Sequence, residues 1–116
     1  MAISRSAMGA KTLPGEYFWS SEVYETETRK IFRKQWICVG RASDIPVPGD
    51  HFIYELDGES FILVRDDQNR LNCFYNVCRH RGTRLCERSC GHFKQRIQCP
   101  YHAWTYDLSG DLKSAP

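Results

Sequence analysis

The chain has 116 residues, with 16 Lys and Arg against 14 Asp and Glu and a formal net charge of +2. This length is enough for one domain with one core, and it excludes a second large domain. The mild charge gives no reason to expect nucleic acid or a membrane surface as a partner, and no apolar run approaches the roughly 20 residues that span a bilayer.

The first twelve residues predict an extended or disordered arm. Residues 1–11 are mainly Ser, Ala and Gly with two basic residues, and they contain no apolar core of a secretory signal. A cytoplasmic location is therefore expected.

Residues 13–36 predict a lead segment and one helix. Leu13-Pro14-Gly15 is a turn signal, and Ser20-Ser21 supplies a cap for a helix over residues 22–35. Acidic side chains come early in this helix and basic ones late, which suits the helix dipole. One face would carry the less polar side chains, Tyr24, Thr28, Ile31 and Phe32.

From residue 37 onward the pattern predicts a mostly antiparallel β domain. Short strands are expected over residues 36–40, 51–56, 60–65, 71–77, 93–98 and 103–107. Asp57-Gly58 is a strong hairpin signal, and Ser109-Gly110-Asp111 marks another turn. Two of the strands lead directly into loops that carry cysteine and histidine.

These two loops are the strongest signal in the sequence. Cys78-Arg79-His80 is followed, after eighteen residues, by Cys99-Pro100-Tyr101-His102, so each loop offers one thiolate and one imidazole. A tetrahedral zinc site usually takes two Cys from one hairpin and two His from a helix. One of each per loop instead suits a two-iron cluster with two Cys on one iron and two His on the other. A structural zinc site is the alternative.

The two motifs carry a family resemblance. Cys78-Arg79-His80-Arg81-Gly82 and Cys99-Pro100-Tyr101-His102-Ala103-Trp104 resemble the Rieske motifs in the oxygenase component of Rieske non-haem iron oxygenases. The flanks over residues 13–18, 32–36 and 105–110 are similar to that component as well. The residues of both motifs are most similar to those of enzymes that act on quaternary ammonium compounds, such as choline, glycine betaine and carnitine.

The resemblance implies a Rieske-type antiparallel β-sandwich over residues 37–116, with two cluster-binding loops and an N-terminal helix. It implies that Cys78, His80, Cys99 and His102 hold a [2Fe-2S] cluster. It also implies Arg79, Gly82, Pro100, Tyr101 and Trp104 as residues around the cluster.

In the family, a reductase or ferredoxin supplies the electrons. The cluster passes them to a mononuclear Fe(II) held by two His and one carboxylate, where O2 is activated for hydroxylation or demethylation. Family members are usually trimers, so the electron crosses from the position of His102 to a neighbouring subunit. Only fourteen residues follow His102, and none is His. The catalytic iron domain is therefore expected to be absent, which makes this chain an excised module that transfers electrons and hydroxylates nothing alone.

Two departures separate the sequence from the Rieske proteins of cytochrome complexes. Thr83 and Tyr101 occupy the positions of a disulfide in those proteins. Ala103-Trp104 replaces a Gly-Ser pair, which removes a hydroxyl that would bond to cluster sulfur. A potential near the low end of the range from roughly −150 to +300 mV is expected.

The stretch over residues 79–96 is basic, with Glu87 as its single acid. It is interpreted either as a docking surface for an acidic electron donor, through Arg81, Arg84 and Arg88, or as a solvated surface that offsets cluster charge.

The remaining candidates have plainer interpretations. Cys86 and Cys90 are expected to be free and partly buried, Cys38 and Cys73 to pack as small apolar residues in strands, and Tyr106 to lie in the core. His51 and His92 are not expected to bind metal.

Two alternative functions stay open. A free-standing Rieske ferredoxin fits the length but not the helical lead, and a zinc-binding interaction module would be colourless and redox-silent.

Overall fold

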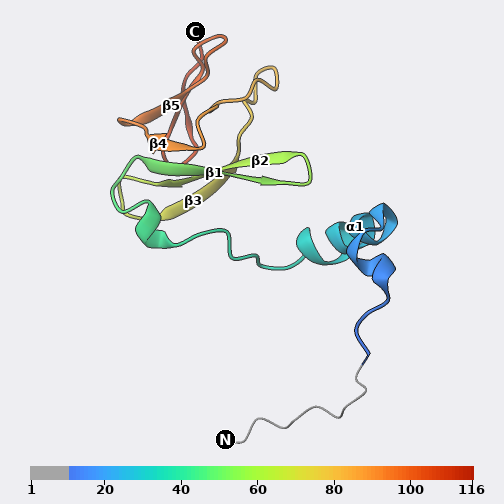
Figure 1. Ribbon diagram of the computed structural model, residues 1–116. Helices are drawn as coiled ribbons and strands as arrows, with labels where there is room; N and C mark the ends of the chain where they lie inside the picture. The colour runs from blue at the N-terminus through green and yellow to red at the C-terminus, as the bar shows by residue number, and fades with distance from the viewer. Residues whose placement is uncertain (1–10) are drawn as a thin grey trace, which may run out of the picture. The chain divides into compact units, whose positions relative to one another are not determined.

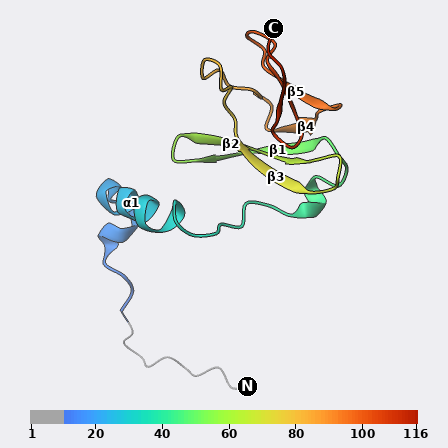
Figure 2. The same ribbon diagram turned by 180° about the vertical axis from the view of Figure 1, so that it is seen from behind.

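The computed structural model describes residues 11–116, which divide into two compact units with the boundary between Cys38 and Val39. Figures 1 and 2 show the helical unit and the β unit from opposite sides. All but the last two residues of the predicted N-terminal arm lie outside the described residues. Within the described range, no helix has the length and apolarity needed to cross a bilayer.

The first unit contains a short 3₁₀ helix, Gly15–Phe18, followed by α1, Ser21–Glu27. The predicted cap is present, because the Ser20 hydroxyl accepts a hydrogen bond from the backbone N–H of Val23 at 3.4 Å. The predicted helix over residues 22–35 is too long. The chain changes to a π-helical turn over Thr28–Phe32, after two β-branched threonines that weaken α-helix formation.

The predicted apolar face of this helix is only partly covered. Thr28 is buried, whereas Tyr24 and Ile31 are about half exposed. The predicted strand over residues 36–40 is wrong, because these residues form an irregular segment and the Trp36 side chain is fully exposed.

The second unit is built on an antiparallel four-stranded sheet in the order β3-β2-β1-β4. Its strands are β1 Asp50–Leu56, β2 Glu59–Arg65, β3 Leu71–Tyr75 and β4 Cys90–His92. Asp57 and Gly58 both have positive φ (50° and 77°), as a two-residue type I′ turn requires. The predicted hairpin is therefore confirmed, with Leu56 paired to Glu59 at its end.

A three-stranded antiparallel sheet follows, in the order β5-β6-β7. Its strands are β5 Arg96–Gln98, β6 Thr105–Asp107 and β7 Leu112–Ser114. The strands predicted over residues 93–98 and 103–107 begin later in the structure, at Arg96 and Thr105. Ala103 cannot join a strand because its φ is +58°.

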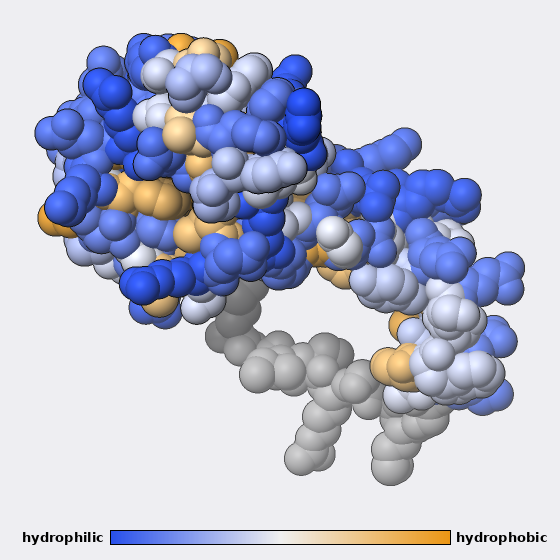
Figure 3. Space-filling model, turned by 90° about the horizontal axis from the view of Figure 1, so that it is seen from above, coloured by the Kyte–Doolittle hydropathy of each residue, from blue (hydrophilic) through white to orange (hydrophobic). Residues whose placement is uncertain are grey.

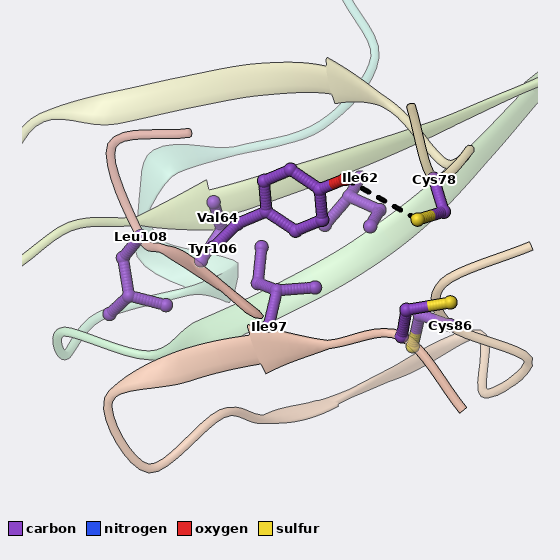
Figure 4. Close-up of a cluster of buried hydrophobic side chains, with 8 residues drawn as sticks. Ile62, Val64, Cys78, Cys86, Ile97, Tyr106 and Leu108 are labelled. Carbon is purple, nitrogen blue, oxygen red and sulfur yellow. Dashed lines mark hydrogen bonds between the residues drawn. The ribbon is translucent and has the colours of Figure 1, made fainter. Parts of the chain in front are cut away.

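Side chains from both sheets form the hydrophobic core. Ile62 and Val64 of β2 are fully buried, and they pack with Ile97 of β5 and Tyr106 of β6 (Figure 4). The same cluster contains three thiols, Cys78, Cys86 and Cys99. The predicted mostly antiparallel β fold is confirmed, and its core ends where both cysteine-histidine loops begin.

Candidate metal centre

The two cysteine-histidine loops are closed by the same pair of backbone hydrogen bonds. In the first loop, Cys78 N donates to Thr83 O at 2.7 Å, and Gly82 N donates to Cys78 O at 3.0 Å. In the second loop, Cys99 N donates to Trp104 O at 2.8 Å, and Ala103 N donates to Cys99 O at 3.1 Å. Each loop therefore spans six residues, and its cysteine is bonded through both its N–H and its carbonyl.

Each loop also needs a left-handed residue at its fifth position. Gly82 has a φ of +71° and Ala103 a φ of +58°. Glycine adopts this conformation readily, whereas an alanine there is strained. Gly82 was expected around the cluster, and Ala103 is its structural counterpart in the second loop.

Replacing Gly82 by alanine is expected to lower the melting temperature by roughly 4–8 °C, since a left-handed alanine costs about 1 kcal/mol. A Cβ atom on Gly82 would meet nothing within 4 Å, so the cost comes from the backbone alone.

Circular dichroism measures the melting temperature of the variant. Gly58→Ala is the matched control, because Gly58 has a φ of +77° and open space but lies in the β1–β2 turn. Both variants should melt earlier, and only Gly82→Ala should alter the spectrum of a bound metal centre. Melting of Gly82→Ala at the wild-type temperature would contradict the loop description.

The four proposed ligand side chains are arranged as two pairs across the loops. Cys78 and Cys99 are each 2% exposed, and the Cys99 side chain is close enough to lower the pKa of Cys78. The rings of His80 and His102 lie edge to face with centroids 4.8 Å apart. No three His, Cys, Asp or Glu side chains within residues 11–116 form a site for a single ion. Thiol beside thiol and imidazole beside imidazole is the pairing used by a two-iron cluster that has two cysteine and two histidine ligands.

The Nδ1 atoms of His80 and His102 are buried, and neither has a hydrogen-bond partner among the described residues. Buried polar atoms are nearly always hydrogen-bonded, so two orphaned nitrogens in neighbouring rings need an explanation. Binding of both nitrogens to a metal centre supplies one. The donor set therefore fits a cluster with histidine on one iron.

The protonation states around the site favour metal binding. Burial raises the pKa of Cys78, but the Tyr106 hydroxyl, the backbone N–H of His80 and the Cys99 side chain outweigh burial and lower it overall. Burial and the neighbouring His102 lower the pKa of His80. Thiolate and neutral imidazole are the forms that bind metals.

Tyr106 contacts the first loop, although the sequence favoured the core over the cluster surroundings for this residue. Its side chain is buried in the core, as predicted, but its hydroxyl also lies 3.3 Å from Cys78 Sγ (Figure 4). The same hydroxyl accepts a hydrogen bond from the backbone N–H of Arg79 at 3.2 Å. A tyrosine on β6 thus reaches across to the first loop.

An aromatic ring contacts each of the two histidine rings. Trp104 stacks on His80 at 4.7 Å with 5° between the ring planes, and Tyr101 lies 3.8 Å from His102 with a tilt of 37°. Tyr101 is largely exposed, as is Pro100. Of the residues predicted around the cluster, the structure places Trp104 and Tyr101 against the two imidazoles.

The three arginines predicted for donor docking differ in their surroundings. Arg84 is held by Glu55 at 2.6 Å and Glu87 at 3.4 Å. Arg81 and Arg88 are exposed and form no ion pair within the described chain. Hydrophilic side chains cover most of the face seen in Figure 3, with small hydrophobic areas between them. Arg81 and Arg88 are therefore the available cations, whereas Arg84 neutralises neighbouring carboxylates.

Buried Asn76 anchors the segment between the loops, a role that no motif in the sequence indicates. Its amide nitrogen donates to Cys86 O at 2.7 Å, and its amide oxygen accepts from the backbone N–H groups of Leu85 and Cys86. Its backbone N–H bonds to Ser60 O on β2. The inter-loop segment is thus fixed to the four-stranded sheet.

The other cysteines and histidines lie elsewhere. Cys86 is buried with its sulfur 3.4 Å from His51 Nε2, and His51 is buried against Phe93. Cys90 is exposed, so the expectation that it is partly buried is wrong. Cys73 lies in a strand as predicted, but both Cys38 and Cys73 are exposed, so the expectation that they pack as small apolar residues is wrong. His92 pairs with Asp50 at 2.9 Å on the surface.

Comparison with known proteins places these features in context. A family profile described as "Rieske [2Fe-2S] domain" matches residues 35–116. The oxygenase subunit of carnitine monooxygenase from Acinetobacter baumannii is 43% identical over 106 residues, which is 91% of this chain and 28% of the relative. The glycine betaine monooxygenase oxygenase subunit of Chromohalobacter salexigens is 39% identical, over 93% of this chain and 24% of the relative.

Two solved structures of Rieske oxygenases are also similar to this chain. The quaternary ammonium Rieske monooxygenase CntA, in complex with γ-butyrobetaine, is similar with a TM-score of 0.82 and 42% identity, over 90% of this chain and 30% of that one. Naphthalene 1,2-dioxygenase from Rhodococcus sp. gives a TM-score of 0.76 and 35% identity, over 82% and 21%. The chain thus spans less than a third of the length of these relatives.

Proposed function

Since the chain belongs to the Rieske [2Fe-2S] domain family, we propose that it transfers single electrons through a cluster held by Cys78, His80, Cys99 and His102. A Rieske domain binds a [2Fe-2S] cluster, which supplies reversible one-electron chemistry. The observation that carries this assignment is the pairing across the loops, with both thiols in one buried cluster and the two imidazoles in contact, while neither buried Nδ1 atom has a hydrogen-bond partner within residues 11–116.

The surrounding residues support the same assignment. Two closed loops hold the cysteines at the buried end of the core, where water is excluded. The Tyr106 hydroxyl is placed to donate a hydrogen bond to the thiolate of Cys78. Such a bond stabilises negative charge on sulfur and so favours the reduced state.

We further propose that the chain serves as the electron-transfer module of a non-haem iron oxygenase. Support comes from relatives named as carnitine and glycine betaine monooxygenase oxygenase subunits. In this proposal, a catalytic domain with mononuclear Fe(II), in the same or a neighbouring subunit, receives the electron and carries out O2-dependent hydroxylation or demethylation. A quaternary ammonium compound is the proposed substrate class for that domain. A cytoplasmic location stays a prediction from the sequence.

The test of the cluster assignment is a visible and electron paramagnetic resonance spectrum of the dithionite-reduced protein, with iron and sulfide analysis on the same sample. Two irons and two sulfides per chain, with the rhombic signal of a His-ligated cluster, are expected. A colourless protein with one zinc ion per chain would refute it.

We also propose that a reductase or ferredoxin donor docks through an acidic surface onto Arg81 and Arg88. Reversing both charges to Glu is expected to slow reduction by the donor about tenfold at low salt, and much less at high salt, where screening removes the attraction. Stopped-flow reduction measured across a salt series gives both effects. Arg84 is left intact, because its change would break the ion pair with Glu55.

The matched control for this prediction is the double variant Arg29→Glu, Lys30→Glu. It changes the net charge by the same amount as the Arg81 and Arg88 double variant, but at exposed residues of the helical unit. We expect it to keep the wild-type rate at low salt. Equal slowing in both double variants would mean that only the total charge matters and would remove the docking proposal.

A further inference from the structure

We infer that Trp104 is a positioning residue that holds the imidazole of His80 in its metal-binding orientation. This rests on the proposed assignment of His80 as a cluster ligand. The indole and the imidazole are parallel to within 5°, and their centroids are 4.7 Å apart. The two residues come from different loops, so the contact also joins the loops to each other.

Apart from the edge of the His102 ring, Trp104 is the aromatic group that contacts the His80 ring within residues 11–116. A histidine that binds a metal usually donates a hydrogen bond from its second ring nitrogen, which sets the ring plane. Within residues 11–116 the ring of His80 forms no hydrogen bond, and its Nδ1 is buried. A flat aromatic surface fixes the ring plane in another way, since stacking restricts rotation of the imidazole but leaves its edge free. The nitrogen atoms on that edge stay available to a metal.

Trp104 is itself firmly placed. Its carbonyl accepts the hydrogen bond from Cys99 N at 2.8 Å that closes the second loop. Its side chain is partly buried and packs against the core cluster. The indole therefore has a fixed relation to Cys99, and through stacking it imposes that relation on His80.

Trp104 and Tyr106 each contact one proposed ligand of the first loop. They are two residues apart, Trp104 directly before β6 and Tyr106 within it. Tyr106 contacts Cys78 through its hydroxyl, and Trp104 contacts His80 through its ring face. This one short segment thus contacts both proposed ligands of the first loop.

The test compares Trp104→Leu with Trp104→Phe in protein that has been isolated with its cluster. Two quantities are measured: the g-values and linewidths of the reduced cluster, and the rate at which a chelator removes iron. Loss of an orienting partner typically weakens metal binding 10–100-fold, so Trp104→Leu should lose iron about tenfold faster and give shifted, broadened signals. Trp104→Phe keeps a flat ring and should restore the wild-type spectrum.

A control separates positioning from general loss of packing. Phe61→Leu removes an aromatic pair in the four-stranded sheet, where Phe61 and Tyr75 lie 4.9 Å apart. It should lower the melting temperature and leave the g-values unchanged. Wild-type g-values and iron loss in Trp104→Leu would overturn the role of Trp104, as would iron loss that follows melting temperature alike in Trp104→Leu and Phe61→Leu. A wild-type protein without any cluster would instead overturn the ligand assignment on which this inference rests.

Discussion

Replacement of Cys99 by serine is expected to abolish cluster binding and to lower thermal stability. Serine has the size of cysteine but offers an alcohol that does not ionise at neutral pH, so one of the two paired thiolates is lost. A group that binds only the folded chain adds its binding free energy to folding, about 4 kcal/mol when it is present 1,000-fold above its dissociation constant. Each kcal/mol corresponds to roughly 4–8 °C in a domain of this size. Iron and sulfide analysis and a melting curve of the purified variant measure both effects.

The matched control is Cys73→Ser. Cys73 lies on β3, outside both loops, and is exposed. This variant should keep its iron, sulfide and melting temperature. If Cys99→Ser also kept two irons and two sulfides per chain, the second loop would not be part of the centre.

The variant Tyr106→Phe is expected to lower the midpoint potential of the cluster by about 60 mV, the shift that a 1.4 kcal/mol change produces for one electron. With Cys78 ionised, the tyrosine O–H is the donor across the 3.3 Å contact. Reduction adds negative charge, and a hydrogen bond to sulfur stabilises that charge more in the reduced than in the oxidised state. Removing the hydroxyl therefore makes reduction harder while the phenyl ring continues to fill the core.

A redox titration followed by visible circular dichroism measures this shift. Tyr75→Phe is the control, because the Tyr75 side chain is 59% exposed and removing its hydroxyl should not move the potential. The sequence suggested a low potential because Trp104 replaces a hydroxyl residue. Tyr106 supplies a hydroxyl from another position, so the wild-type potential should lie above that of Tyr106→Phe. Equal potentials in the two proteins would show that the contact does not act on the cluster.

Local signals in the sequence predicted the parts of the fold that depend on neighbouring residues. The alternation over residues 51–65 with Asp57-Gly58 between its halves gave the β1–β2 hairpin correctly. The two cysteine-histidine motifs pointed to loops at strand ends, where the structure places them. Each of these features is encoded within a few consecutive residues.

The features that were missed depend on contacts between distant parts of the chain. Cys90-Gly91-His92 has little β propensity and becomes β4 because it pairs with Asp50–Phe52 of β1. Tyr106 meets Cys78 across 28 positions in sequence. The opposite error was made for residues 36–40, because their apolar pattern predicts a strand whereas the structure has an irregular segment there.

The matching backbone hydrogen bonds of the two loops have a consequence for how the metal centre assembles. Ordering a residue's backbone costs about 1–2 kcal/mol in conformational entropy. Residues 78–83 and 99–104 are held by bonds within the polypeptide itself, so this cost is met as the chain folds. We therefore expect the loops to depend little on iron–ligand bonds for their shape, so that more of the energy of forming those bonds appears as affinity.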